Sequence, residues 1–283
     1  MPEPILTNKL TDDRESWDIK WNTVADVVES HRKSNEQDES VALIDRFLCE
    51  LRTKYIWAVD LGCGNGRHVL RYDEAAKGRL IGADFSISGL RSIRKINSSA
   101  DLAVSDATAL PFCDGVFDAV LMVGVVYEIE DLDKHIEVFA EIRRVLKPGG
   151  VCLFVSNSNF HLLDRLYVRF PKYNPIVRRL LGKAPVDRDE LRFWYYRLTD
   201  ADVRNYARVA GLRLQGPQYC NVRSGLGRTW DGVLVTGDSY ENLIRFKANP
   251  LVKVIGHLLL AAAYLLPNLS ARTAVYQLHK CEG

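Results

Sequence analysis

The sequence predicts an α/β fold, in which a mostly parallel sheet is covered by helices on both faces. A short apolar run over residues 56–61 leads into a turn with glycine at every second position. Further short runs rich in apolar residues follow at 80–84, 102–107, 117–124 and 151–155. The run at 117–124 is continuous in apolar residues, which is typical of strands buried on both faces. The segments between runs suit connecting helices, and the one over residues 132–146 ends at a Lys-Pro-Gly-Gly break.

The turn after the first run indicates a bound ligand. Glycine suits a turn that needs positive φ, or a backbone that a ligand approaches closely, and here it occupies positions 62, 64 and 66. A helix beginning after the turn would direct its N-terminal amides and the positive end of its dipole at that ligand. The spacing is not the dinucleotide fingerprint, because Arg67 holds the place of its third glycine.

Acidic residues accompany the turn and end two of the predicted strands. Asp60 lies two residues before the first glycine. Asp84 ends the run at 80–84, about 20 residues beyond the turn, where nucleotide-binding βαβ units carry the acid that binds ribose hydroxyls. Asp106 follows the third run. The pattern predicts a ligand that contains a nucleoside.

Five pieces of the chain, in order and at matching spacing, resemble the class I S-adenosylmethionine-dependent methyltransferases, including the ubiquinone and menaquinone methyltransferase branch. The pieces are Asp60–Gly66, Asp84, Asp106-Ala107, Phe117-Asp118 and Leu146–Gly150. The resemblance covers roughly residues 55–157. It implies a Rossmann-like seven-stranded sheet, an α-helical lid inserted after strand five, a second insertion before the last strand, and S-adenosylmethionine as cofactor.

The resemblance also assigns residues to the cofactor site. They contact, in turn, the methionine part, the ribose, the adenine and the floor of the site. The residues are Asp60, Gly62 and Gly64 for the methionine part, Asp84 for the ribose, Phe85, Asp106 and Ala107 for the adenine, and Val123 for the floor.

Two other interpretations of these residues stay open. Asp60 could cap the turn, and Asp84 could cap a helix that begins near Ser86 or Ser88, which would make both acids structural. An NAD-dependent enzyme with a degenerate fingerprint is the other competitor.

Composition excludes several classes of protein. The 283 residues, 47% of them hydrophobic and 26% charged, predict a globular protein that buries a substantial core. The net charge of +2 gives no overall nucleic-acid signature, so a basic partner site has to be local. The six cysteines lack metal-ligand spacing and predict reduced thiols in a cytoplasmic protein without a metal site. The first residues lack the pattern of a signal peptide.

The predicted elements divide the chain into four parts. Residues 1–40 are polar and carry Trp17 and Trp21, which predicts either a helical lid over the cofactor edge or a helix docked through its tryptophans. Residues 41–157 form the S-adenosylmethionine-binding core, opened by a helix with apolar residues at helical spacing over 41–51.

The third part, residues 158–198, is an insertion that we expect to form the substrate lid. It holds nine basic residues against four acidic ones, and eight aromatic residues. Ligands of open α/β sheets bind outside the carboxyl ends of the strands, and an insertion after strand five opens over that edge. The composition suits an acceptor with an anionic group and an aromatic or apolar part, and the candidate substrate-binding residues are Trp194, Tyr195, Tyr196 and Arg197. A solvated pair of basic helices is the alternative.

The fourth part, residues 199–283, completes the core. Thr199 and Asp202 predict a capping box that begins a helix, which ends at Gly211 before a sixth strand near 212–214. Residues 230–236 and 273–279 both qualify as the last strand. The second is favoured because it alternates in polarity and lies at the chain end.

An apolar stretch over residues 251–266 lies between two prolines. Its sixteen residues fall short of the roughly 20 that a membrane-spanning helix needs. It predicts either a helix buried against the lid or an interfacial helix that gives peripheral membrane contact. Interfacial placement favours a lipid-linked acceptor.

The candidate catalytic residues lie after strand four and at the start of the lid. Methyl transfer from a sulfonium needs alignment of the acceptor and, for oxygen or carbon acceptors, removal of a proton. Tyr127 and Glu128 follow strand four, where many relatives carry a histidine, and His161 opens the lid. The departure leaves a histidine base in doubt. His135 is expected to face solvent.

Three functions remain open. The first is methyl transfer to a small-molecule or lipid-linked acceptor at oxygen. The second is a tRNA methyltransferase of the wobble-uridine type, because the basic, aromatic insertion could hold RNA. The third is a non-catalytic, cofactor-binding partner subunit, and the intact set of glycines and acids argues against it.

Overall fold

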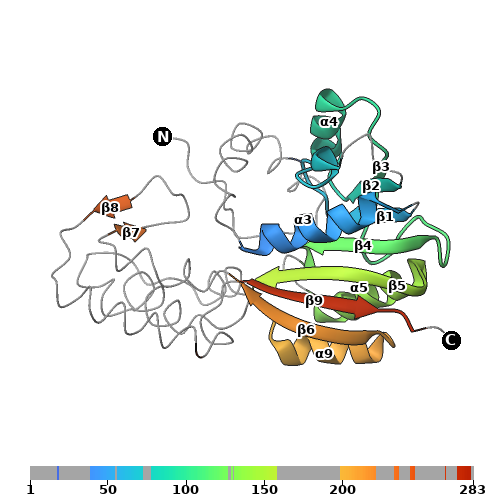
Figure 1. Cartoon of the computed structure of the whole chain (residues 1–283), viewed down its shortest axis with the longest axis vertical. Coiled ribbons are helices and arrows are strands. Elements are labelled where there is room, and N and C mark those ends of the chain that lie inside the picture. The colour runs from blue at the N-terminus through green and yellow to red at the C-terminus, as the bar shows by residue number, and fades with distance from the viewer. Residues whose placement is uncertain are drawn as a thin grey trace. The chain divides into compact units, whose positions relative to one another are not determined.

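The computed structural model describes residues 18, 39–54, 56–72, 78–126, 129, 131–157, 198–220, 233–235, 243–245, 265 and 273–281. These residues contain a seven-stranded sheet in the order β3-β2-β1-β4-β5-β9-β6 and a separate two-stranded pair, β7 and β8 (Figure 1). The strands are β1 Trp57–Leu61, β2 Arg79–Asp84, β3 Leu102–Val104, β4 Phe117–Val123, β5 Leu146–Asn157, β6 Arg213–Cys220, β7 Val233–Val235, β8 Leu243–Arg245 and β9 Thr273–His279.

The first five strands run parallel, which confirms the predicted α/β class. β1 lies between β2 and β4, and β3 and β5 extend the sheet on either side. Val59 of β1 and its partner Val120 of β4 are completely buried. The central strands are therefore apolar on both faces, as the run at 117–124 predicted.

The last strand makes the sheet mixed. Lys280, just after β9, exchanges backbone hydrogen bonds with Gly149 and Gly150 near the start of β5, so β9 runs antiparallel to β5 (Figure 1). Residues 273–279 are therefore the closing segment favoured from the sequence. The other candidate contributes β7, which pairs with β8 outside the large sheet.

The break after residue 146 differs from the prediction. Lys147–Gly150 do not separate a helix from a strand that begins at 151, because β5 already begins at Leu146. The pairing with β4 shifts register between Phe117 and Ala119, and Gly149 has φ of 75°. A bulge thus takes up the Pro-Gly-Gly segment within the ladder.

The helices follow the predicted capping signals. α3 spans Glu39–Arg52, α4 spans Ile87–Ile96, α5 spans Leu132–Val145, and α9 spans Asp200–Val209. Thr199 and Asp202 form the expected capping box, in which each side chain bonds the other residue's backbone amide. α5 and α9 meet through Phe139 and Tyr206, whose ring centroids are 5.6 Å apart, and Phe139 also contacts Phe154 of β5.

The chain divides into two compact units. One contains residues 1–156, 196–218 and 275–283, and the other contains 157–195 and 219–274. The predicted boundaries at 40, 157 and 198 remain predictions. The lid segment 158–198 lies outside the described residues apart from Leu198, and the apolar segment 251–266 lies outside them apart from Leu265, which is exposed. Among the described residues, none belongs to a helix with the length and apolar character that crossing a bilayer requires.

Candidate cofactor site

The glycine turn is held by the end of the neighbouring strand. The amides of Gly62 and Cys63 both donate to the carbonyl of Ala83 in β2, at 2.8 and 3.2 Å, and the Gly66 amide donates to the Cys63 carbonyl. These three amides therefore bind the protein itself. After the turn comes the 3₁₀ helix η2, Val69–Arg71.

Glycine is required at two positions of this turn. Gly62 has φ of 70°, and a Cβ there would lie 2.2 Å from Cγ2 of Val125. Gly66 has φ of 84°, and its Cβ would lie 2.5 Å from Cγ1 of Ile93. At both positions a side chain larger than hydrogen is excluded, because the positive φ disfavours it and neighbouring atoms occupy its place. Gly62 is exposed, and Val125 already occupies the space that a Cβ there would enter.

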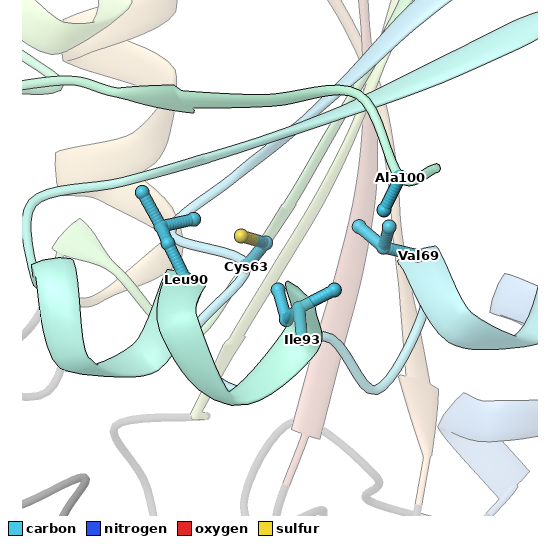
Figure 2. Packing of buried hydrophobic residues seen from close by; sticks show 5 residues of the cluster. All are labelled: Cys63, Val69, Leu90, Ile93 and Ala100. Atoms are coloured by element: carbon cyan, nitrogen blue, oxygen red, sulfur yellow. The ribbon is translucent and has the colours of Figure 1, made fainter. Parts of the chain in front are cut away.

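A small apolar cluster supports the turn from beneath. Cys63 and Val69 from the turn region pack with Leu90 and Ile93 of α4, and Ala100 completes the cluster (Figure 2). Ile93 is completely buried and is the residue against which Gly66 packs. The turn is thus held rigidly between β1 and α4.

Asp84 connects the two loops that surround the turn. Its Oδ2 accepts from the Gly64 amide at 2.7 Å, and its Oδ1 accepts from the Ser86 amide at 2.8 Å. The side chain is only 8% exposed. Asp84 is not the cap of α4, because Ser86 takes that position and accepts from the Gly89 amide.

Asp60 is a buried carboxylate whose hydrogen bonding is incomplete. It is 1% exposed, and among the described residues its Oδ2 has no hydrogen-bond partner. Burial and then the neighbouring charge of Asp84 raise the pKa of Asp60 well above its ordinary value, against a smaller opposing effect of Arg67. A cationic group beside Oδ2 would compensate this burial.

The third acid lies in a different environment. Asp106 is exposed, and its Oδ1 accepts from both the amide and the hydroxyl of Thr108. This turn follows β3, and Ala107 beside it is half-buried. Asp106 therefore lies at the rim of the site, whereas Asp60 and Asp84 lie inside the fold.

A side-chain network from α5 fixes the segment that follows Asp106. Arg144 donates to the carbonyls of Leu110 and Phe112 and to Asp114, and it pairs with Glu141 through two nitrogens. Glu141 in turn accepts from the Leu110 amide at 2.6 Å. The hydrogen bond from Arg144 lowers the pKa of Glu141. No pattern in the sequence predicted this network.

The remaining predicted cofactor residues lie at strand ends. Val123 ends β4 and is half-buried, and Phe85 follows β2 and is half-buried as well. Val125, which faces Gly62, was not predicted. Its place follows from the pairing of Leu61 with Met122, which brings the end of β4 beside the turn.

A residue of the N-terminal segment also reaches this region. Oδ1 of Asp18 accepts from the Ser86 hydroxyl at 2.5 Å and from the Ser88 amide at 2.9 Å. The sequence placed Asp18 between two tryptophans and gave it no role.

The predicted catalytic and acceptor-binding residues cannot be compared with the structure. Tyr127, Glu128 and His161, and the substrate candidates Trp194–Arg197, lie outside the described residues. His135 is described, and the expectation that it faces solvent was wrong. It is completely buried, and its Nε2 lies 2.7 Å from the Ile129 carbonyl, so it fastens the segment after β4 to α5.

Within the described part of the chain, no group of three or more His, Cys, Asp or Glu residues is arranged to hold a metal ion. All six cysteines are free thiols.

Comparison with known proteins gives a family for the core. Residues 59–154 match the family described as "Methyltransferase domain". The demethylmenaquinone methyltransferase of Staphylococcus epidermidis is 31% identical over 135 residues, which cover 45% of this chain and 55% of that protein. That of Shouchella clausii is 32% identical over 136 residues, which cover 44% and 57%. The chain thus spans a little over half the length of these relatives.

Solved structures agree on the fold. An S-adenosylmethionine-dependent methyltransferase from Methanosarcina mazei aligns with a TM-score of 0.53 over 84% of this chain and 98% of that chain, at 15% identity. A chain from the complex of the Haloferax volcanii Trm112 methyltransferase activator with a methyltransferase aligns with a TM-score of 0.55. It covers 96% of this chain and 100% of that chain, at 16% identity.

The residues of the turn suit this cofactor. S-adenosylmethionine carries a sulfonium and an ammonium, and the partnerless Oδ2 of buried Asp60 offers the anion that such a cation needs. Gly62 is exposed at the turn, and Asp84 ends β2, where nucleotide-binding βαβ units carry the acid that binds ribose hydroxyls. The chain therefore contains a class I methyltransferase domain, and its cofactor is S-adenosylmethionine.

Proposed function

We propose that this protein transfers a methyl group from S-adenosylmethionine to a small-molecule or lipid-linked acceptor. The buried Asp60 carboxylate with its partnerless oxygen is the observation that carries the proposal. A buried anion without a partner is costly, and a cationic methyl donor at the glycine turn offsets that cost. NAD would place its anionic pyrophosphate at this turn, next to the buried carboxylate, and this weighs against the NAD alternative.

The cofactor contacts are proposed as follows. Asp60 pairs with the ammonium of the methionine part, and the backbone of Gly62 and Gly64 lies against that part. Asp84, which ends β2, accepts hydrogen bonds from the ribose hydroxyls, as the acid at this position does in nucleotide-binding βαβ units. The adenine lies among the side chains and backbone at Phe85, Asp106 and Ala107, above Val123.

The acceptor is proposed to combine an apolar or aromatic part with a polar or anionic group. Support comes from the relatives named demethylmenaquinone methyltransferases and from the aromatic, basic composition of residues 158–198. Residues 194–197 are the proposed acceptor contacts in that segment. Residues 251–266, if they lie at a bilayer surface, would bring the protein to a lipid-linked acceptor.

Oxygen is the proposed acceptor atom. Bound S-adenosylmethionine supplies an activated methyl group, and the acceptor gains that methyl and loses a proton while S-adenosylhomocysteine leaves. Tyr127, Glu128 and His161 are the proposed groups that accept this proton. Single substitutions that lower turnover without weakening cofactor binding would identify the base among them.

Calorimetric titration of S-adenosylmethionine and, in parallel, of NAD tests the cofactor assignment. We expect micromolar binding of the first and none of the second. Transfer of labelled methyl groups is then measured with a reduced demethylated naphthoquinone carrying an isoprenoid tail, with its tailless analogue, and with bulk tRNA. Label in either quinone supports the proposal, and fragmentation of the product by mass spectrometry separates oxygen from carbon methylation. Label in tRNA alone would contradict it.

The tRNA alternative depends on residues 158–198, almost all of which lie outside the described residues. Binding to RNA would be strongly salt-dependent, since it would rest on phosphate contacts. The Haloferax volcanii protein is in complex with an activator, which raises the same question for this chain. Turnover by the isolated chain would exclude both a non-catalytic subunit and an absolute need for such a partner.

A further inference from the structure

We propose that Asp18 is a positioning residue of the cofactor site, which fixes the turn that carries Asp84 and Phe85. The inference rests on the proposed function, because it takes Asp84 and Phe85 as contacts of the ribose and adenine. It assigns a role in cofactor binding to one residue of the N-terminal segment, through its two hydrogen bonds to Ser86 and Ser88.

The geometry places Asp18 on the first turn of α4. One oxygen, Oδ1, accepts from the Ser86 hydroxyl at 2.5 Å and from the Ser88 amide at 2.9 Å. These partners lie 68 and 70 residues further along the chain. The Ser86 hydroxyl meanwhile accepts from the Gly89 amide at 3.1 Å. Asp18 thereby fixes the direction in which that hydroxyl donates.

The same residues lead directly to the glycine turn. The Ser86 amide donates to Oδ1 of Asp84, and Oδ2 of Asp84 accepts from the Gly64 amide. A continuous chain of hydrogen bonds therefore runs from Asp18 through Ser86 and Asp84 to Gly64. Loss of Asp18 releases the Ser86 side chain and loosens the backbone on which Asp84 depends.

A purely capping role does not account for this contact. Ser86 already caps α4 by accepting from the Gly89 amide, and the helix begins with that bond in place. Asp18 satisfies a further amide, that of Ser88, from a distant segment, and bringing that segment into place costs chain entropy. Its negative charge suits the positive end of the helix dipole. The arrangement holds the turn more firmly than helix stability requires.

The test compares Asp18→Ala with Thr199→Ala, which removes the cap of α9 far along the sheet. Both variants lose a hydrogen bond to the first turn of a helix, so both should lose similar thermal stability. S-adenosylhomocysteine, which shares the adenosine part, serves as the calorimetric probe beside S-adenosylmethionine. We expect Asp18→Ala to weaken both ligands about tenfold, the equivalent of one charge-assisted hydrogen bond. Thr199→Ala should change neither by more than about twofold.

Two more variants sharpen the result. Asp18→Asn keeps the accepting oxygen and should retain affinity within about threefold of the wild type. Combining Asp18→Ala with Ser86→Ala should weaken binding by clearly less than the product of the single effects, because the two residues act through one chain of hydrogen bonds.

Unchanged affinity in Asp18→Ala, with the same loss of thermal stability as Thr199→Ala, would reduce Asp18 to a capping residue and overturn the inference. The inference would also be overturned if the loss of affinity in the double variant equalled the product of the losses in Asp18→Ala and Ser86→Ala. Failure of the wild-type protein to bind either ligand would instead contradict the proposed function.

Discussion

The region around the glycine turn and the region around α5 satisfy their buried polar groups differently. In the α5 region, Arg144 and Glu141 bond each other and the loop at 110–114, and His135 bonds the Ile129 carbonyl. In the turn region, Asp60 is buried with an oxygen that has no hydrogen-bond partner among the described residues, and its pKa is raised by burial and by Asp84. The named polar groups of the α5 region are paired within the protein. Asp60 is not, and this difference supports our proposal that the turn region binds a cation.

This contrast predicts opposite outcomes for substitutions in the two regions. Polar residues of the α5 region should contribute to stability and only indirectly to binding. Some polar residues of the turn region should favour ligand binding while lowering the free energy of unfolding, as is typical of functional sites.

The largest effect is expected from Asp84→Ala, because Asp84 both holds the turn and contacts the ligand. It removes the acceptor for the amides of Gly64 and Ser86. We expect a loss of about 2–4 kcal/mol in the free energy of unfolding and at least about a hundredfold loss of affinity for S-adenosylmethionine. Urea denaturation and calorimetry measure the two.

Asp106→Ala is the matched control for Asp84→Ala. Asp106 is exposed and bonds within its own turn to Thr108, so stability should change by less than about 1 kcal/mol. Equal losses of stability in the two variants would remove the distinction between an acid inside the fold and one at its rim.

Gly62→Ala tests how tightly the turn packs against Val125. The added Cβ meets Val125 at 2.2 Å, whereas a Cβ at Gly115, also at positive φ, comes only within 3.9 Å of the Leu146 carbonyl oxygen. Both alanines carry the strain of the left-handed conformation, about 1–2 kcal/mol. Gly62→Ala should cost about 2 kcal/mol more than Gly115→Ala, because it also overpacks the site. Urea denaturation checks this, and equal costs would mean that Val125 moves aside freely.

Asp60→Asn should stabilise the ligand-free protein while weakening binding. Burial raises the pKa of Asp60 above its ordinary value of 3.8, so ionising this group in the folded state costs free energy. This cost to the free energy of unfolding is absent at a pH below the pKa of Asp60 in the unfolded protein. It grows as the pH rises from there, and it levels off above the pKa of Asp60 in the folded protein. At about pH 7 we expect Asn to add about 1–2 kcal/mol of stability, and at about pH 3 to add almost none.

The same substitution should lower the affinity for S-adenosylmethionine about tenfold or more, since it removes a charge pair. Thermal unfolding across this pH range, with and without S-adenosylmethionine, measures both effects. A less stable variant at neutral pH would show that the Asp60 carboxylate is already compensated within the protein.

A smaller effect on cofactor affinity is expected from Arg144→Lys. Lysine keeps the positive charge but lacks the branched guanidinium, which bonds Leu110, Phe112 and Glu141 at the same time. We expect a loss of about 1–2 kcal/mol in unfolding free energy and only a few-fold change in cofactor affinity. Arg71→Lys, at an exposed ion pair with Asp45, should cost under about 0.5 kcal/mol. A large selective loss of affinity in Arg144→Lys would place the α5 region within the binding site.

Local patterns in the sequence predicted the features that depend on local physics. Apolar runs predicted the parallel strands, Thr199 and Asp202 predicted a capping box, and alternation predicted β9 as the closing strand. The glycines and acids of the cofactor site were recognised by their spacing. Each of these signals lies within a few consecutive residues.

Features that join distant segments were not predicted. The burial of His135 depends on α9, and the contacts of Arg144 span up to 34 residues. Asp18 reaches α4 across 70 residues. The bulge in β5 was read as a break, because Pro-Gly-Gly ends helices far more often than it lies within a ladder. Contacts between distant segments leave no periodic pattern in a single sequence, so sequence analysis alone does not detect them.

Proton release on cofactor binding tests the central claim most directly. Calorimetry of S-adenosylmethionine binding at about pH 5–6, in buffers of different ionisation enthalpy, counts the protons exchanged. If a cation compensates Asp60, binding lowers the pKa of that carboxyl, so the wild-type protein releases protons and Asp60→Asn does not. Binding without proton release, at equal affinity in both proteins, would contradict the account and return Asp60 to a structural role.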